Sequence, residues 1–561
     1  MKVSQIPYKR CTLEHLSESM EKIFAMIKDA KCADDVIAAR EEYLKIYTEF
    51  ETEASLAYCR SSLNTRDEFY KAEQDYYDEI TPAAVELMTR YGNMLLDCPF
   101  RAELEQKLSP VLFKSYEVAR KSMSPEIIDD MVEENKYVTE YSVFMSDLTF
   151  EFRGETVPLT ILRGYFTDDD RNTRREAYEV LGRRLEEVSD TLDGIFDKLV
   201  KVRDRMARKM GYKNFVELGY YRMGRLCYDA DMVAKYRANI LKDIVPVVAR
   251  LKARVAERLG LDKIMIYDDA VTVPGGNPRP VLDKDGIFRE AREMYHKMSS
   301  YSGSFIDMML ENEAFDVDSR EGKWGGGYCT QFRAYKQPFI LANFNGTAGD
   351  IDVITHEAGH AFADYMTADN KFPELGMGGM ETAETHSMSM EFFAWPYMDK
   401  FFGDRARQYK YMHALDAFAF LPYGTIVDYF QHIVYEKPEL TPAERKAEWK
   451  KLEQQFKPYM HTEGVPYLEL GTRWQYQMHI YESPFYYIDY CLAQVVAFQF
   501  LLESQKDYDD AFARYFRYLC HGGELVFTDL IKEAGLVSPF EDGALAEVAK
   551  GVEALLSELE E

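Results

Sequence analysis

Cysteine is scarce in this chain, and long apolar runs are missing. The eight cysteines are scattered without a C-x-x-C pair, which argues against a zinc ribbon and against the disulfide framework of a small secreted domain. The densest apolar stretch, LAQVVAFQFLL (492–502), is too short to span a bilayer. In a signal peptide an apolar segment follows the basic N-terminal residues, and this sequence has no such segment there. We therefore expect a cytoplasmic protein without a membrane partner.

Positive charge is also in short supply. The 68 lysines and arginines are outnumbered by 96 aspartates and glutamates, which gives a net charge of −28. A field of this sign repels nucleic acid and anionic lipid, so we expect no nucleic-acid partner. The same acidity tolerates cationic ligands, although it also serves simply to keep a protein in solution. The sequence gives no indication of the oligomeric state.

Most of the chain has the pattern of amphipathic helices. Apolar residues recur at three- and four-residue spacing in segments such as 13–30, 33–58 and 173–211. Residues 146–166 alternate around a glycine instead, which predicts a small hairpin. The stretches YCTQF and PFILANF, within residues 322–350, predict strands. We expect a mostly α fold with a small β-sheet, divided near residue 200.

The stretch DVITHEAGHAF (352–362) is the most informative part of the sequence. Thr347 and Asp350 lie three residues apart just before it, which predicts a capping-box start for a helix that runs through Asp364. Gly359 lies inside this helix, where glycine costs roughly 1 kcal/mol relative to alanine. A glycine kept at that cost indicates that another backbone segment passes close by.

On this helix His356 and His360 are one turn apart on the same face. Two imidazoles so placed can bind one zinc ion, with Glu357 beside the first able to polarise a metal-bound water. The alternative is a pair of histidines hydrogen-bonded on a polar helix face, and a third ligand decides between the two. The extended H-E-x-x-H-x-x-G-x-x-H pattern is not present, because Ala363 and Met366 occupy its glycine and last histidine positions. A carboxylate on a following helix remains.

A glycine-rich turn within residues 372–395 leads into the next predicted helix. Glu384 and Glu391 are seven residues apart on it, so two turns place them on one face. That arrangement suits one glutamate as a zinc ligand and the other as a partner that orients a ligating histidine. We expect ordinary polar or packing roles for His386, His413, His432 and His461.

HEAGHAF, followed 24 residues after His360 by Glu384 in ETAETHSMSMEFFAW, resembles the thimet oligopeptidase and oligoendopeptidase F family of zinc metallopeptidases. The resemblance implies that one zinc ion is held by His356, His360 and Glu384. It also implies that Glu357 acts as the general base and that Glu391 has a supporting role.

A second signature lies in WQYQMHIYESPFYYIDYCLAQ (474–494), a histidine followed by clustered tyrosines. Within it, the sequence HIYESPFYYIDY resembles the Pz-peptidase-like oligoendopeptidase branch of the family. The resemblance implies that His479 and either Tyr486 or Tyr490 face the substrate, with Tyr487 as a competing position. The tyrosines also make chemical sense on their own, because a neutral phenol near zinc can donate a hydrogen bond to the oxyanion of a tetrahedral intermediate.

The stretch PFILANFNGTAGDIDVITHEAGH is similar to the strand-then-helix segment of the family, in which an edge strand lines the active-site cleft. We expect the substrate backbone to add beside this strand through main-chain hydrogen bonds. The substrate-binding residues predicted on this basis are Phe339, Ile340, Leu341, Ala342 and Asn343.

The resemblance covers most of the C-terminal 350 residues, including segments 210–225 and 522–540, and the N-terminal 150 residues match only as a helical region. It implies a large fold of two helical lobes around a deep channel. In that fold residues 1–200 are a mainly helical region that walls the substrate channel, and residues 201–561 are the catalytic zinc-peptidase domain.

The predicted function is a zinc-dependent oligoendopeptidase that hydrolyses internal bonds of short peptides with water activated by the metal and Glu357. An exopeptidase of the same chemistry, such as a carboxypeptidase, differs only in how the cleft is closed at one end. A non-catalytic peptide-binding protein with structural zinc is the third reading. It fits less well, because structural zinc sites carry four protein ligands, commonly with cysteine.

Overall fold

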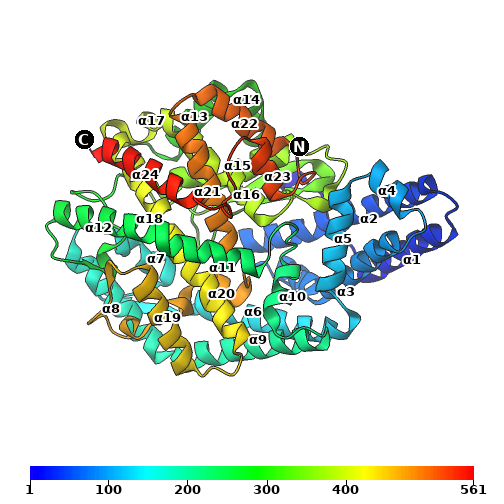
Figure 1. The fold of residues 1–561 in the computed structure, drawn as a ribbon, viewed down its shortest axis with the longest axis horizontal. Helices are drawn as coiled ribbons and strands as arrows, with labels where there is room; N and C mark the ends of the chain where they lie inside the picture. The colour runs from blue at the N-terminus through cyan, green and yellow to red at the C-terminus, as the bar shows by residue number, and fades with distance from the viewer. Residues whose placement is uncertain (561) are drawn as a thin grey trace.

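Helices dominate the architecture, as the amphipathic pattern predicts. The computed structural model describes residues 1–560, and 71% of the protein is helical. Within these residues the strands form one three-stranded sheet and two two-stranded pairs. Figure 1 shows how helices make up most of the molecule. The prediction of a mostly α fold is confirmed.

The first helices of the chain form one end of the molecule, drawn in blue in Figure 1. They have a hydrophobic core of their own, in which Leu16 is fully buried and the rings of Tyr43 and Tyr91 stack with centroids 3.8 Å apart. The first of these helices begins where the side chain of Thr12 accepts a hydrogen bond from the backbone N–H of His15. The elements are α1 (Leu13–Asp29), α2 (Ala33–Leu63), α3 (Glu68–Leu96), α4 (Arg101–Lys107) and α5 (Pro110–Ser122). Helix α6 (Ile128–Asp147) follows them and buries Tyr141 in the larger core of the molecule.

The predicted hairpin is present as strands β1 (Thr149–Phe152) and β2 (Glu155–Pro158), which pair antiparallel. Arg153 and Gly154 join them with φ values of 53° and 85°. Positive φ at both residues of a two-residue loop matches the right-handed twist of the flanking strands. The helices that follow are α7 (Leu159–Gly164), α8 (Arg171–Glu187), α9 (Ser189–Lys209), α10 (Phe215–Arg222), α11 (Ala230–Asn239), α12 (Val245–Leu259), α13 (Lys284–Met298) and α14 (Ser300–Glu311). The division of the chain near residue 200 stays a prediction.

Two short strands, β3 (Ile264–Met265) and β7 (Met460–His461), pair in parallel across nearly 200 residues of sequence. The three-stranded sheet contains β4 (Phe315–Asp316), β5 (Tyr328–Phe332) and β6 (Gln337–Leu341) in the order β4-β6-β5. Strand β6 therefore has a partner on both sides: it is antiparallel to β5 and parallel to β4.

The central position of β6 corrects one prediction. A strand can accept a peptide only along an edge whose N–H and C=O groups are unpaired, and both edges of β6 are already used. Its side chains are buried, and the amide of Asn343 just beyond it donates to the carbonyls of Trp324 and Gly326 at 3.0 and 2.9 Å. Within residues 1–560 the strands of this sheet with an unpaired edge are β4 and β5, and β5 also packs against α15. The prediction of an edge strand is thus wrong for Phe339, Ile340, Leu341, Ala342 and Asn343.

Four helices near the centre of Figure 1 support the segments that carry the sequence motifs. Helix α16 (Met380–Phe393) packs against α15 (Gly349–Met366) on one side and against α21 (Tyr487–Ser504) on another. Helix α18 (Ala406–Glu436) packs against α21 as well. The remaining helices are α17 (Asp399–Phe402), α19 (Pro442–Phe456), α20 (Met478–Glu482), α22 (Tyr508–Cys520), α23 (Phe527–Glu533) and α24 (Ala544–Glu560).

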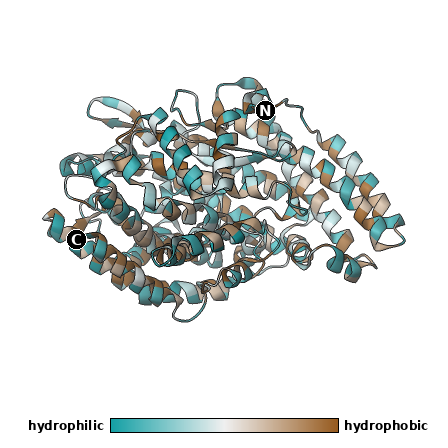
Figure 2. Cartoon of the chain, turned by 90° about the horizontal axis from the view of Figure 1, so that it is seen from above, coloured by the Kyte–Doolittle hydropathy of each residue, from teal (hydrophilic) through white to brown (hydrophobic). Residues whose placement is uncertain are grey.

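Hydrophilic and hydrophobic residues are mixed along the helices, as Figure 2 shows. The mixture reflects helices that bury one face against the core and leave the other in water. Within residues 1–560, no helix combines the length and the apolar character that crossing a membrane requires.

Candidate active site

Helix α15 begins in a different way from the predicted capping box. Its N-cap residue is Ala348, which makes no side-chain cap. The hydroxyl of Thr347 binds the side chain of Asn345 instead, and the carboxylate of Asp350 accepts the backbone N–H groups of Asn345 and Gly346 at 2.9 Å each. The capping-box prediction is therefore wrong, although Asp350 still satisfies donors that precede the helix. The helix ends at Met366, two residues after the predicted Asp364.

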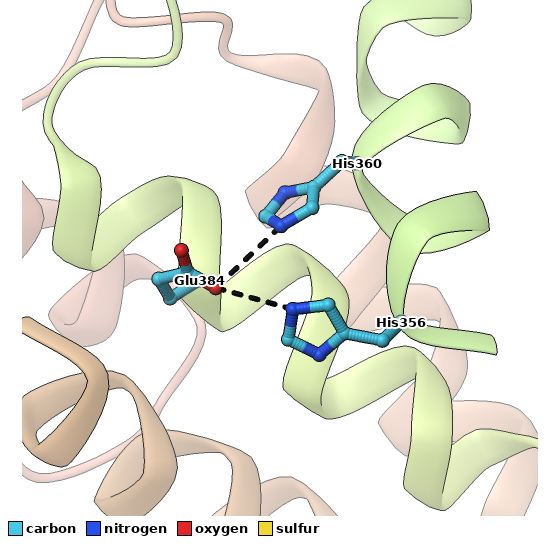
Figure 3. A group of neighbouring side chains, drawn as sticks. All are labelled: His356, His360 and Glu384. Atoms are coloured by element: carbon cyan, nitrogen blue, oxygen red, sulfur yellow. Dashed lines mark ion pairs between the residues drawn. The ribbon is translucent and has the colours of Figure 1, made fainter. Parts of the chain in front are cut away.

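Two histidines of α15 and one glutamate of α16 point toward one another, as Figure 3 shows. The Nε2 atoms of His356 and His360 lie 3.4 and 3.5 Å from Oε2 of Glu384. Among the described residues these three side chains form a group whose ligand atoms all lie within 4.8 Å of one another. Two ligands bound to zinc at 2.0–2.1 Å with a tetrahedral angle are about 3.3–3.4 Å apart. The observed separations fit a single zinc ion.

Gly359 brings the two helices close enough for this convergence. A Cβ atom at this position would lie 2.7 Å from Cα of Ser387 and 3.0 Å from the carbonyl oxygen of His386, both on α16. Contacts this short leave no room for a side chain, so only glycine allows α15 and α16 to approach so closely. The prediction that another backbone passes Gly359 is confirmed.

Glu391 lies two turns after Glu384 and contacts two histidines. Its Oε1 is 2.6 Å from Nδ1 of His356, and its Oε2 is 2.6 Å from Nε2 of His413 on α18. Nδ1 of His413 is in turn 2.9 Å from the indole nitrogen of Trp395. Because an indole N–H can only donate, Nδ1 of His413 is the acceptor and its proton resides on Nε2. Glu391 therefore accepts one hydrogen bond on each oxygen.

This chain of contacts orients the ligand His356. With Nδ1 donating to Glu391, the neutral imidazole presents the lone pair of Nε2 to the position between His360 and Glu384. Burial alone raises the pKa of a carboxyl group, but the hydrogen bonds from His356 and His413 outweigh it and lower the pKa of Glu391 to about 2. The carboxylate is therefore charged over the whole range in which histidine can bind a metal.

Replacing Glu391 by glutamine is expected to weaken zinc binding by about 10- to 100-fold. Each carboxylate oxygen of Glu391 faces a different histidine, so in glutamine an NH₂ group replaces one acceptor and opposes the donor in front of it. Competition with a chromophoric chelator measures the zinc affinity, and thermal unfolding of the zinc-free protein separates this effect from general destabilisation. Unchanged zinc affinity would contradict the orienting role of Glu391.

Glu357 lies beside the ligand group with its carboxylate unengaged. It is half-buried, and the hydrogen bonds of the site go to Glu384 and Glu391 rather than to Glu357 among the described residues. Its charge is one of the causes, after burial, that raise the pKa of Tyr490 and of Cys329 on β5. Glu357, on the ligand helix α15, is thus close to the tyrosine cluster and to strand β5.

The three clustered tyrosines have different surroundings. The hydroxyl of Tyr486 donates to Oε1 of Glu384 at 2.5 Å, and the ring of Tyr490 lies 4.8 Å from that of Tyr486 between centroids. Burial first, and then the charge of Glu384, raises the pKa of both phenols, so both stay protonated. Tyr487 packs instead against the rings of Phe420 and Tyr423. The structure therefore brings Tyr486 and Tyr490 to the metal ligands and leaves Tyr487 at the side.

Two hydrogen bonds in series, from Tyr423 to Gln477 and from Gln477 to His479, fix the orientation of the His479 ring. The hydroxyl of Tyr423 donates to Oε1 of Gln477 at 2.7 Å, and Nε2 of Gln477 lies 2.9 Å from Nδ1 of His479. The amide N–H therefore donates to Nδ1, which leaves the imidazole proton on Nε2. Burial lowers the pKa of His479 to about 4, despite the opposing charge of Glu384. At neutral pH the ring is an uncharged donor.

Two residues of the site, His413 and Gln477, were not predicted from the sequence. His413 was expected to have an ordinary polar or packing role, and the structure instead gives it the second oxygen of Glu391. Gln477 fixes the tautomer of His479. The only sequence signal for Gln477 was its position two residues before His479, and His413 carried none, because it lies on a separate helix.

The helical fold, with two histidines one turn apart, a glutamate on the next helix and an unengaged glutamate beside them, is that of a metallopeptidase. The chain belongs to peptidase family M3: residues 284–550 match Peptidase family M3, and residues 3–123 match the Peptidase M3 N-terminal domain. The predicted family is confirmed.

Several relatives agree with this assignment. A solved structure described as Pz peptidase A with inhibitor 2 is 43% identical over 99% of both chains, with a TM-score of 0.96. A protein described as an oligoendopeptidase F from Bacillus anthracis strain Ames is 40% identical over 100% of this chain and 98% of its own, with a TM-score of 0.91. Oligopeptidase PepF of Bacillus subtilis strain 168 is 25% identical over 419 residues, which are 71% of this chain and 58% of that relative, so the match spans less than two thirds of its length.

Proposed function

We propose that the protein is a zinc-dependent oligoendopeptidase that hydrolyses internal bonds of short peptides. The observation that carries this proposal is the convergence of His356, His360 and Glu384 beside the unengaged Glu357 in a member of family M3. Zinc is the favoured metal because two imidazoles and a carboxylate without a thiolate are a common catalytic zinc set, in which a fourth position stays open.

In the proposed mechanism the protein's own groups handle the protons and the developing charge. A zinc ion bound by the three ligands supplies Lewis acidity. Glu357 takes a proton from the attacking water and then passes it to the leaving amine. Tyr490, Tyr486 and the Nε2–H of His479 are the candidate donors to the oxyanion of the tetrahedral intermediate. Glu391 keeps His356 in the tautomer that can bind a metal.

We further propose that the peptide backbone adds along the free edge of β5, where Cys329 lies near Glu357. Main-chain hydrogen bonds along a strand edge recognise peptides largely without regard to sequence. This position replaces β6, whose two edges are occupied. The deep channel and the partition at residue 200 belong to the same proposal and rest on the family resemblance.

A carboxypeptidase-like exopeptidase of the same chemistry is the second candidate, since it uses the same ligands and the same base. A peptide-binding protein with structural zinc fits less well, because the ligand set has three members and the adjacent carboxylate is unengaged. Short peptides are the proposed partners. A cytoplasmic location is proposed on the eight unpaired cysteines, which are dispersed among the described residues.

Digestion of a series of peptides that share one sequence and increase in length distinguishes an oligoendopeptidase from an exopeptidase. The protein is expected to carry about one zinc ion per chain by elemental mass spectrometry. Mass spectra of the products are expected to show internal cuts, with an upper limit on substrate length set by the channel. Stepwise removal of single residues from one end would favour the exopeptidase. Intact peptides of every length, with the zinc-loaded protein, would contradict peptidase function altogether.

A further inference from the structure

A cavity of about 360 Å³ opens beside the metal ligands and is not used by the proposed mechanism. His479 and Tyr490 are among its lining residues, so it adjoins the position of the reacting peptide bond. Its volume lies within the range of small-ligand pockets. Asp352 of α15 and Asp416 of α18 also line it. A substrate side chain next to the cleaved bond that enters the cavity therefore shares it with these carboxylates.

Three of the residues that line the cavity carry carboxylates: Asp352, Glu391 and Asp416. Glu391 is saturated by its two histidines, and Asp352 accepts a hydrogen bond from the hydroxyl of Tyr409 at 3.0 Å. Asp416 lines the cavity and accepts no hydrogen bond from any described residue. Burial raises the pKa of Asp416 to about 7 and that of Asp352 to about 6, as expected of carboxylates without an adequate counter-ion.

Among the described residues no lysine or arginine lines this cavity, although the imidazole of His413 does. Lys252 lowers the pKa of Asp416 from a distance, but its ammonium group is bound by Asp269, with Nζ 2.9 Å from Oδ1. The carboxylates of the cavity also do not form a second metal site. Among the described residues, the ligand atoms of His356, His360 and Glu384 are the only group that lie within 4.8 Å of one another. The imidazole of His413 is engaged by Glu391, so a cationic ligand would supply the counter-charge that Asp416 lacks.

An independent observation also indicates a polar ligand. Gln494 of α21 lines the cavity, is only 5% exposed, and has an amide nitrogen buried without a hydrogen-bond partner. An unsatisfied buried amide costs about 1–3 kcal/mol, and a ligand that brings a polar group to this point removes that cost. Rotating the amide by 180° presents its oxygen to a cation, since the two orientations have the same shape.

Apolar side chains also line the cavity: Met388, Met412, Ala417 and Phe420. A long aliphatic stem packs against such walls, and a charged group at its end reaches the carboxylates. Lysine and arginine have this combination of an aliphatic stem and a cationic tip, whereas a short or acidic side chain leaves Asp416 unpaired or repels it.

We propose that this cavity is a specificity subsite for a basic side chain, lysine or arginine, at one of the two positions that flank the cleaved bond, with Asp416 as its charge partner and Gln494 as its amide partner. The inference rests on the proposed peptidase function and goes beyond it by naming the chemistry of one substrate position.

The test compares peptides that differ at one position. A peptide cleaved by the protein is made with lysine, norleucine or glutamate at either residue flanking the cleaved bond, and kcat/KM is measured for each. At one of the two positions, kcat/KM of the lysine peptide is expected to exceed that of the norleucine peptide by about tenfold, the factor that one charge-assisted hydrogen bond contributes. Asp416→Asn is expected to reduce that lysine-to-norleucine ratio to about two, and Gln494→Met is expected to reduce it by a smaller factor.

Two controls separate the subsite from the general acidity of the protein. Glu436→Gln removes a carboxylate from the exposed end of the same helix and is expected to leave the ratio as in the wild type. A peptide with its lysine at the amino terminus, far from the cleaved bond, is expected to show no dependence on Asp416. Equal kcat/KM for the lysine and norleucine peptides at both positions would overturn the subsite while leaving the peptidase intact. No cleavage of any peptide by the zinc-loaded wild type would overturn the peptidase and the subsite together.

Discussion

Glu357→Gln is expected to lower kcat for peptide hydrolysis by about 10²- to 10⁴-fold, the usual contribution of a positioned general base and acid. Glutamine has nearly the shape of glutamate but cannot take the proton of the attacking water. Because the hydrogen bonds of the site go to Glu384 and Glu391, the substitution breaks no structural contact. Single-turnover cleavage of a quenched peptide measures the loss.

Zinc content distinguishes loss of the base from loss of the metal. The Glu357→Gln protein is expected to bind zinc as tightly as the wild type, since Glu357 is not one of the three converging groups. Glu384→Gln is the matched contrast: the same chemical change one helix away is expected to weaken zinc binding and cleavage together. A Glu357→Gln protein that cleaves at the wild-type rate would rule out the assigned base.

Short-range patterns allowed the ligand helices to be predicted. The four-residue spacing of His356 and His360 and the seven-residue spacing of Glu384 and Glu391 define helix faces without knowledge of the fold. Gly359 indicated the close approach of a second backbone, because a mid-helix glycine is costly and needs a packing reason. The hairpin at residues 149–158 was predictable for the same kind of reason, from alternation around a glycine.

Relations between distant segments could not be predicted in this way. His413 lies 22 residues from Glu391 in sequence, and only the packing of α18 against the central helices brings its imidazole to the carboxylate. The sheet is a second case. The pattern of PFILANF identified a strand, but whether a strand is at an edge depends on its neighbours, and the short β4 that covers β6 carries almost no pattern. Topology, rather than propensity, decided both errors.

The sequence also does not distinguish Tyr486 from Tyr490 as the hydrogen-bond donor to the oxyanion. In the structure the proton of Tyr486 is committed to Oε1 of Glu384 at 2.5 Å, a short charge-assisted hydrogen bond. The hydroxyl of Tyr490 donates to no described residue, and burial together with Glu384 and Glu357 raises its pKa, so that it keeps its proton. We infer that Tyr490 is the donor and that Tyr486 positions Glu384.

Tyr490→Phe is therefore expected to lower kcat by about 10²- to 10³-fold, the cost of removing one donor to an oxyanion. Its KM is expected to change little, because the hydrogen bond forms only as negative charge develops on the carbonyl oxygen. Pre-steady-state cleavage of a quenched peptide measures kcat, and chelator competition measures zinc affinity, which this substitution leaves unchanged.

Tyr486→Phe is the matched comparison, since it removes the same hydroxyl from the neighbouring ring. Its expected effect is on the metal: without the hydrogen bond to Oε1, Glu384 is less constrained, and zinc affinity falls by about 10- to 100-fold. At saturating zinc its kcat is expected to recover, whereas that of Tyr490→Phe does not. The reverse result, a kcat defect in Tyr486→Phe that zinc does not restore, would assign the oxyanion to Tyr486 and require its hydroxyl to leave Glu384 when substrate binds.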